Sequence, residues 1–537
     1  MKNLQFKYSI LMIWAFFFCV QGFSQHHMVV ANNIKVNVSP DIYLVEPGNL
    51  TMNSGSAFNL SGMLTIDGTF TNNAGTSAFT LTSTSSNTGS LIEGTGISAT
   101  IQRFISQDVY HYLSSPVEAQ AMSILQTGTA HTDFDLFWFD EDNSSGQGPL
   151  WIDAAAQGGN MEVGLGYSYT YNTSDRTIEY TGTTNTGTIT EPLTYTYDAN
   201  ISTNPWYFGW NIIGNPYPSR LDAEAFIDDS ENSDIYGTLY FWAEAPGFSG
   251  LEDDYGTWNK TGSVAGGTGP APNGNIDLGQ AFMVHTTEVS GSVKFKDGMR
   301  VHNAANFYKT PAQRFKLSVS NSEGNYNEIL IGFVQGASNK ADNKYDGYKL
   351  KGNASLALYT KLVEDDSFDY AIQALPPLTD GATVKVGMDI ANPDFCTLKV
   401  VSIENFNDTT SILLEDLAEN VVVNLRETPE YHFAVNNSGS VVDRFLLHFN
   451  TSAVGMEELG LNEQPLVYVS NGQIIIKTLN DSQSPSIAVF DILGRNVSFT
   501  LTEDDKQFMV NPACKYGVYI IRISFGDSFY SEKVYLK

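Results

Sequence analysis

The sequence predicts an all-β protein, and three observations support this prediction. Short segments in which apolar and small polar residues alternate, such as Leu64-Thr65-Ile66, recur along the 537 residues, and such alternation is typical of half-buried strands. Gly accounts for 46 residues, and only 16% of residues are charged, a composition typical of extracellular β-proteins. Thr, Ser and Asn crowd the predicted turns. We expect a short β-solenoid-like segment (25–100), a Trp-rich β-sandwich region (101–305), a second β-sandwich (311–450) and a C-terminal Ig-like β-sandwich (466–537).

The first 24 residues have the pattern of a secretory signal peptide. Lys2 and Lys7 precede an apolar stretch at 10–20, and the small residue Ser24 suits a cleavage site before Gln25. The apolar stretch is shorter than the roughly 20 residues that a membrane span needs, and no later segment approaches that length. We therefore expect a secreted or surface protein with no membrane span in its mature form. An uncleaved N-terminal anchor remains the alternative.

The charge balance excludes some classes of partner. Removal of Lys2 and Lys7 with the leader leaves 27 basic residues against 59 acidic residues, a net charge of −32. Such a field repels phosphate backbones and anionic lipids, so we expect no nucleic-acid binding and no membrane-surface binding. Of the cysteines, Cys396 and Cys514 remain in different predicted domains. We expect each to be a buried apolar side chain and not half of a disulfide.

Glycines recur in the first mature segment at intervals of six or seven residues, at Gly48, Gly55, Gly62, Gly68 and Gly75. Each short strand between them would end at a corner that glycine permits. The repeat predicts a few coils of a parallel β-solenoid. A flat β-meander with glycine turns is the alternative.

Aromatic side chains gather in the second segment, which holds every tryptophan of the mature chain: Trp138, Trp151, Trp206, Trp210, Trp242 and Trp258. We favour a structural role for these rings, in the core of a β-sandwich. The functional interpretation is a glycan-binding face on which exposed rings stack against sugars. The candidate ligand-binding residues are Trp206, Tyr207, Trp210, Tyr240 and Trp242. Strand alternation would place residues 206, 208 and 210 on one face and 207 on the other.

One acidic loop has part of the pattern of a calcium site. Its oxygen donors stand at alternate positions, at Asp140, Asp142 and Ser144. It departs from the pattern because Ser145 takes the sixth place, where glycine is expected, and Trp151 takes the twelfth, where glutamate is expected. We favour a solvated hairpin tip, since these residues also form turns, and keep calcium as the weaker alternative. We predict no other metal or cofactor.

The third segment returns to regular strands that turn residues punctuate, at 315–319, 328–333, 398–403, 421–425 and 444–449. Their spacing predicts a two-sheet sandwich. A helix-prone linker at 451–465 follows, where proteolytic processing would be easiest.

Catalytic motifs are missing from the sequence. It contains no Gly-x-Ser-x-Gly, His-Glu-x-x-His, phosphate-loop or Cys-x-x-Cys pattern. His131 and Asp133 stand at alternate positions, but no nucleophile accompanies them. We therefore expect a protein that is not an enzyme. The alternative is a secreted glycan-active enzyme with paired carboxylates in the Trp-rich region, because the separation of carboxylates is invisible in sequence.

Three motifs follow one another in the last 72 residues: Asp491-Ile492-Leu493-Gly494-Arg495, then Gly517-Val518-Tyr519, then a terminal stretch from Lys533 to Lys537. In this order they resemble the type A C-terminal sorting domain of the type IX secretion system of Bacteroidetes-like bacteria. The resemblance implies export through the Sec translocon and the type IX machinery, often with removal of the domain. It does not extend to the Asn-Pro pair that often opens such domains. An ordinary Ig-like terminal domain is the alternative.

Within the first motif, Asp491 ends a predicted strand, Gly494 can adopt a positive φ in the turn, and Arg495 is expected to pair with a carboxylate at the corner.

Three stretches of the Trp-rich segment also resemble a recurring region ahead of sorting domains in such secreted proteins: 111–116, 209–219 and 279–284. The middle stretch is the most distinctive. It predicts a buried strand that runs into an Asn-Pro-x-Pro corner, where two prolines fix the backbone. The resemblance implies an architecture and no reaction. We expect a non-enzymatic structural, adhesive or glycan-binding protein.

Overall fold

The computed structural model describes residues 27–142, 148–244, 254–267, 269–302, 312–363, 367–379 and 381–450, and in the last part of the chain 466–470, 473–477, 485–491, 495–504, 507–512, 517–525 and 528–536. The predicted signal peptide with its cleavage site at Ser24 and Gln25, and the predicted linker at 451–465, lie outside these residues. The chain divides into two compact units, Met1–Thr451 and Ser452–Lys537. Both are built of strands, so the all-β prediction is confirmed. The one α-helix among the described residues is α1 (Ala223–Asp228).

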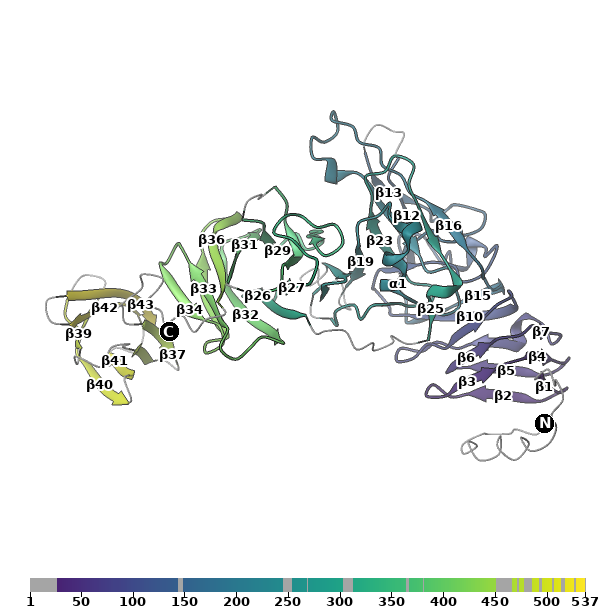
Figure 1. Ribbon diagram of the computed structural model, residues 1–537, viewed down its shortest axis with the longest axis horizontal. Coiled ribbons are helices and arrows are strands. Elements are labelled where there is room, and N and C mark those ends of the chain that lie inside the picture. The colour runs from purple at the N-terminus through teal and green to yellow at the C-terminus, as the bar shows by residue number, and fades with distance from the viewer. Residues whose placement is uncertain are drawn as a thin grey trace. The chain divides into compact units, whose positions relative to one another are not determined.

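The first segment is a β-solenoid of three parallel sheets (Figure 1). Its coils consist of β1 (His27–Val30), β2 (Lys35–Val38) and β3 (Tyr43–Glu46), then β4 (Asn49–Met52), β5 (Ala57–Leu60) and β6 (Met63–Ile66), then β7 (Phe70–Asn72), β8 (Phe79–Leu81) and β9 (Ser90–Glu93). Each strand pairs in parallel with its counterpart one coil later. Parallel pairing excludes the flat meander, because a meander pairs its strands antiparallel.

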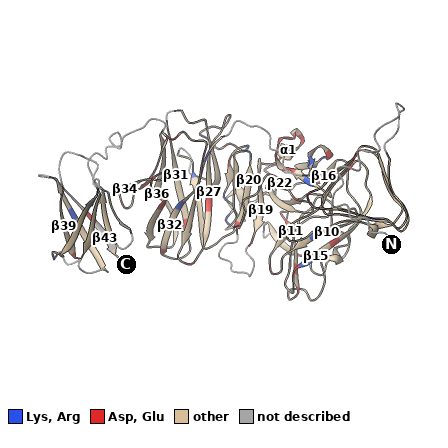
Figure 2. Ribbon diagram, turned by 90° about the horizontal axis from the view of Figure 1, so that it is seen from below, with Lys and Arg blue, Asp and Glu red and all other residues tan. Residues whose placement is uncertain are grey.

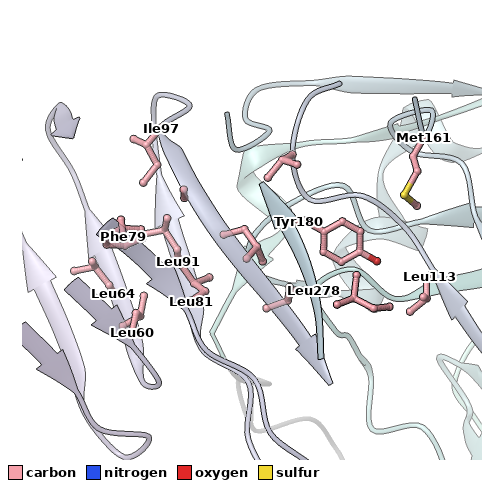
Figure 3. Packing of buried hydrophobic residues seen from close by; sticks show 14 of the residues in the cluster. Leu60, Leu64, Phe79, Leu81, Leu91, Ile97, Leu113, Met161, Tyr180 and Leu278 are labelled. Carbon is pink, nitrogen blue, oxygen red and sulfur yellow. The ribbon is translucent and has the colours of Figure 1, made fainter. Parts of the chain in front are cut away.

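The predicted glycine corners have two physical causes. Gly55 has a φ of 77° and Gly75 a φ of 97°, which glycine adopts without strain. Gly62 instead lies against the preceding coil, where a Cβ atom would be 2.3 Å from the carbonyl oxygen of Ser39. Inward side chains such as Leu60, Leu64, Phe79 and Leu81 stack into one buried core (Figure 3).

The far end of the solenoid is closed by strands from the Trp-rich region. β10 (Ser98–Ile105) pairs in parallel with β8 and antiparallel with β15 (Arg176–Thr183). The solenoid core continues through Tyr180 and Leu278 (Figure 3). One sheet therefore contains strands from both sides of residue 100, at which the first segment was predicted to end.

The Trp-rich region consists of several antiparallel sheets. The first contains β11 (His111–Leu113), β14 (Tyr167–Tyr171), β12 (Phe134–Asp140) and β13 (Leu150–Asp153). The second contains β17 (Trp210–Gly214), β23 (Ala281–His285), β19 (Thr238–Ala243), β20 (Asp254–Asn259) and β21 (Gly262–Val264). Smaller sheets comprise β16 (Ile189–Pro192) with β24 (Ser292–Phe295), and β22 (Asn275–Ile276) with β18 (Arg220–Asp222) and β25 (Arg300–Val301).

The Asn-Pro-x-Pro corner connects the solenoid to the Trp-rich region. The Asn215 amide donates to the carbonyl oxygens of Ser219 and Ile276, at 2.8 and 3.1 Å. The carbonyl oxygen of Pro218 accepts the backbone N–H of Leu91 from the last coil at 2.8 Å. The predicted buried strand with a fixed corner is confirmed, and its physical role is to hold two sheets together.

The third segment forms one sheet of 11 strands that encloses a common core. Its strands are β26 (Gln313–Asn321), β27 (Tyr326–Phe333), β28 (Gly347–Tyr348), β29 (Leu356–Lys361), β30 (Tyr370–Leu375), β31 (Ala382–Ile390), β32 (Asp394–Glu404), β33 (Ser411–Asp416), β34 (Val421–Asn424), β35 (Glu430–Val435) and β36 (Gly439–Asn450). Four of the five predicted strands fall within these elements, and the fifth, 421–425, extends one residue beyond β34. Cys396 is buried, as expected.

The second and third segments pack directly against each other. The Lys349 ammonium lies 2.5 Å from the Asp254 carboxylate, with both side chains buried. The Asp254 carboxylate also accepts the Asn327 amide at 2.7 Å. The solenoid, the Trp-rich region and the third segment are therefore parts of one unit.

The C-terminal unit is a two-sheet sandwich. One sheet contains β37 (Leu466–Ser470), β38 (Gln473–Lys477), β41 (Gln507–Pro512) and β40 (Phe499–Asp504), and the other contains β39 (Ser486–Asp491), β42 (Gly517–Phe525) and β43 (Ser528–Leu536). Inward residues of both sheets, among them Ile476, Val489 and Ile521, form its separate core. This arrangement confirms the predicted sandwich.

Most of the strand ribbon belongs to uncharged residues, and acidic and basic residues occur together beside α1 (Figure 2). There Lys260 lies 2.7 Å from Asp228, and Lys296 lies 2.8 Å from Asp229. Among the described residues, no helix is both long and apolar enough to cross a bilayer.

Candidate functional site

Trp206 lies at the junction between the Trp-rich region and the third segment. It belongs to a 3-10 helix, Pro205–Tyr207, and β17 begins only at Trp210. The prediction that residues 206, 208 and 210 share a strand face is therefore wrong, because Pro205 begins a helical turn whose cap is the Asn204 side chain. The Trp206 ring stacks on His285 at a centroid distance of 4.0 Å and contacts Tyr348 at 3.8 Å. In these contacts the Trp206 ring packs against neighbouring rings.

Two other predicted ligand-binding rings are closed to any ligand in this structure. Trp210 is 8% exposed and Tyr240 is 1% exposed, because both belong to a buried cluster with Ile212 and Met283. The sequence-based hypothesis that these two rings are open stacking faces is therefore corrected, because both rings are buried. Tyr207 is 44% exposed, but its ring contacts only Phe208 among the aromatic side chains of the described residues.

Trp242 is the predicted residue that the structure places in a partly exposed aromatic group. We call this group the aromatic patch and define it as Phe139, Trp151, Trp242 and Tyr255 around the buried Tyr112. Trp242 meets Tyr255 edge-on at a centroid distance of 5.1 Å, and Phe139 meets Trp151 at 5.2 Å. The Tyr112 hydroxyl lies 2.9 Å from the Tyr255 hydroxyl. Edge-to-face contacts and the Tyr–Tyr hydrogen bond fix the orientation of the rings.

Carboxylates flank the aromatic patch on one side. The Glu244 carboxylate accepts the Trp242 indole N–H and the Tyr110 backbone N–H, each at 3.0 Å. The Tyr110 hydroxyl donates to Asp135 at 3.2 Å. Burial, followed by the neighbouring Asp135 carboxylate, raises the pKa of Tyr110, so this hydroxyl stays protonated as a donor. The flank therefore orients Trp242 and presents carboxylate oxygens beside the rings.

His131 extends the polar flank along the same sheet. Its Nδ1 lies 2.8 Å from Asp135 and its Nε2 lies 3.0 Å from Asp153. These hydrogen bonds, first to Asp135 and then to Asp153, raise the pKa of His131. The sequence pairs His131 with Asp133, but the Asp133 carboxylate instead accepts the backbone N–H of Thr129 at 2.7 Å. Both imidazole nitrogens are occupied by carboxylates, which leaves neither nitrogen free to act as a base.

Sequence reasoning missed most of the aromatic patch. Phe139 and Trp151 are directly opposite in the β12–β13 register, so their rings lie on one sheet face. The alternation of Asp135, Phe137 and Phe139 along β12 was a signal for that face. The contact with Trp242 and Tyr255 comes from another sheet, and no local pattern encodes it.

The predicted calcium loop is only partly within the described residues, since Ser144 lies outside them. Asp140 and Asp142 are separated by Glu141, whose buried carboxylate accepts the backbone N–H groups of Thr196 and Gly209 at 2.9 and 2.8 Å. Across the described ranges, no group of three or more His, Cys, Asp or Glu side chains is arranged to hold a metal ion.

The C-terminal motif residues converge at one corner of the second unit. The Arg495 guanidinium lies 2.7 Å from the Asp491 carboxylate, which also accepts the Arg495 backbone N–H at 2.9 Å. The predicted pairing of Arg495 with a carboxylate is confirmed. Tyr519 is buried in the sandwich core, and Gly517 has a φ of 143°. Gly494 and Lys537 lie outside the described residues, as does the side chain of Lys533.

Comparisons with known proteins give a family and no function. No curated protein matches this chain. Among solved structures, a chain described as the full extracellular region of plexin A4 is 8% identical, with a TM-score of 0.09. The match covers 84% of this chain and 43% of that one, so the present chain spans less than half of its length, and the likeness is too low to support any argument.

A family model described as a domain of unknown function, DUF8693, matches residues 19–449. The match includes the solenoid, the Trp-rich region and the third segment, and it ends just before the C-terminal unit begins at Ser452. The chain belongs to the DUF8693 family.

Proposed function

We propose that this chain is an exported, non-enzymatic surface or secreted protein. In this proposal the Met1–Thr451 unit is the cargo, and the Ser452–Lys537 unit is a type IX sorting domain. The observation that carries the proposal is the separate C-terminal sandwich with its own core, since a sorting domain that is read and removed must fold without the cargo.

The corner at Asp491 and Arg495 supports the sorting role. The pair joins Asp491, the last residue of β39, to Arg495, and the Asp491 backbone N–H donates to the Arg495 carbonyl oxygen at 2.9 Å. The Arg495 side chain is 74% exposed, so one face of its guanidinium remains available to a secretion component.

Deletion of residues 452–537 tests the export route. We expect the truncated protein to accumulate in the periplasm, because the Sec signal acts alone. Arg495→Ala should reduce export, whereas Arg522→Ala, on the exposed side of β42, should not. Immunoblots of periplasm, cell surface and medium give the readout. Normal appearance of the truncated protein outside the cell contradicts the sorting role.

For the cargo we propose glycan binding at the aromatic patch. The partly exposed rings of Trp151 and Trp242 offer apolar faces. Glu244, which bonds Trp242, and Asp135, which bonds Tyr110, offer oxygens that accept from sugar hydroxyls. Indole rings oriented by neighbouring side chains lose little entropy on binding.

A glycan array with the mature chain tests this part. Trp151→Ala should lower binding by about 1 to 3 kcal/mol if the ring stacks on a sugar, and Tyr207→Ala, an exposed ring outside the patch, should not change it. Equal binding by the wild type and Trp151→Ala places the ligand elsewhere, and no binding to any glycan leaves a structural or adhesive role.

The alternative, a glycan-active enzyme, has one buried carboxyl group in its favour. Burial, and secondarily Glu162, raises the pKa of Glu191 to about 8. A carboxyl group that holds its proton near neutral pH is what a general acid needs. Release of reducing sugars by the wild type and its loss in Glu191→Gln would establish this alternative, and binding without turnover excludes it.

A further inference from the structure

In the part of the chain that the structure describes, the solenoid has one uncovered end, at its first coil. Within the described residues, β1, β2 and β3 each pair with a single neighbour, namely β4, β5 and β6. All three are therefore edge strands at the same end of the stack, and Figure 1 shows them farthest from β10 and β15. Edge strands present unpaired backbone groups to any strand that reaches them.

The direction of these backbone groups follows from the hydrogen bonds to the second coil. Carbonyl oxygens of Val30, Ile34 and Ile42 accept N–H groups of the next coil at 2.9 to 3.0 Å. The backbone groups of the even-numbered residues thus form hydrogen bonds to the next coil. By the alternation of a strand, odd-numbered residues such as Val29, Asn37 and Val45 direct their N–H and C=O groups toward the open end.

The core of the first coil is also incompletely covered. The inward residues Met28, Val36 and Leu44 are partly exposed, whereas their partners one coil later, Leu50, Phe58 and Leu64, are fully buried. On the outer surface of the same coil, Val29 is 50% and Val45 is 45% exposed. A solenoid end with an apolar core usually requires a cap.

We propose that a second copy of this chain caps this end, first coil against first coil. Three edge strands on three sides of a coil need an occupant with three strands in the same arrangement, and a single extended peptide pairs with only one. At the opposite end β10 pairs with β8, and the Pro218 carbonyl oxygen accepts the Leu91 N–H of β9, so another first coil cannot stack there head to tail. A two-fold contact between first coils remains, which makes each new strand pair antiparallel.

The first coils of two copies are compatible in strand length and in charge. Each of its strands has four residues, so a two-fold axis through β2 pairs β2 with its copy and β1 with β3 of the second copy. Outward Val29 then lies against outward Val45 of the second copy. The coil carries one basic residue, Lys35, and two acidic residues, Asp41 and Glu46, so two first coils repel each other far less than two whole acidic chains would. The inference rests on the proposed signal cleavage, which leaves Gln25 as the first residue.

Light scattering on the purified chain 25–537 over a range of concentrations tests the proposal, and because this chain is produced directly, the result does not depend on the export route. We expect a dimer mass. Val29→Lys should weaken dimerisation by about tenfold or more, since the charge enters an apolar strand pair. The matched control is Thr71→Lys, which places the same side chain in the same outward column two coils later.

Hydrogen exchange locates the contact. The amides of Val29, Asn37 and Val45 should become protected as the dimer forms. A monomer at all concentrations overturns the proposal, as does a dimer that Val29→Lys and Thr71→Lys affect equally.

Discussion

The Arg300 guanidinium donates to the Glu93 carboxylate at 2.6 Å, with the two side chains 0% and 1% exposed. The same guanidinium donates to the carbonyl oxygens of Leu91 and Glu93, at 2.9 and 2.8 Å, and lies over the Tyr217 ring. One side chain thus joins the last solenoid coil to the proline corner. Such a pair gives specificity to the joint, because either charge alone would be buried without compensation.

Replacement of Arg300 by Ala should therefore destabilise the first unit by about 3 to 5 kcal/mol, since Glu93 keeps its burial and loses its partner. Urea unfolding followed by tryptophan fluorescence measures the change. Lys399→Ala is the control, because Lys399 and Glu430 form an exposed pair that contributes about 0 to 1 kcal/mol. An equal loss of unfolding free energy in both variants would show that the buried pair stabilises the fold no more than the exposed pair does.

The solenoid corners predict different responses to the same substitution. Gly62→Ala brings a Cβ atom to 2.3 Å from the Ser39 carbonyl oxygen, so the backbone at Gly62 or at Ser39 has to move. We expect a loss of about 1 to 3 kcal/mol. Gly94→Ala meets nothing within 4 Å and should be neutral or stabilise by up to about 1 kcal/mol. The melting temperatures of the two variants are compared with that of the wild type. An equal loss of stability in both would mean that the conformational entropy of the chain, and not the close approach at Gly62, determines the effect.

Local patterns predicted those parts of the fold that depend on neighbours in sequence. The spacing of Gly55 and Gly62 predicted coils because each corner is set within a few residues, and the alternation in Leu64-Thr65-Ile66 predicted a strand that the structure has as β6. The aromatic patch and the Trp206 junction could not be predicted, since Trp242 meets Tyr255 and Trp206 meets Tyr348 only after separate sheets pack. A run of aromatic residues looks the same in sequence whether it binds or packs.

Trp206 provides a test of the packing interpretation. Trp206→Ala removes a ring that contacts His285 and Tyr348 at the junction of two segments. We expect destabilisation of about 3 to 5 kcal/mol with glycan affinity unchanged under conditions where the variant stays folded. Denaturant unfolding and the glycan array measure the two quantities separately. A stable variant with lost binding would return Trp206 to the ligand-binding residues.

Glu191 predicts the pH dependence of stability. Burial raises its pKa from 4.5 to about 8 in the folded chain, so between these values the folded state holds a proton that the unfolded state has released. The free energy of unfolding therefore falls as the pH rises from 4.5 to about 8 and is constant beyond that range with respect to this group.

Glu191→Gln keeps the shape of the side chain and has no proton to lose. Its free energy of unfolding should exceed that of wild type by an amount that grows from pH 4.5 to about 8 and reaches a few kcal/mol at most. Denaturant unfolding at successive pH values gives the two curves, with Glu179→Gln, at an exposed position on β15, as the control. Parallel curves for wild type and Glu191→Gln would mean that the carboxyl group ionises freely in the fold, which would also remove the one feature that favours Glu191 as a general acid.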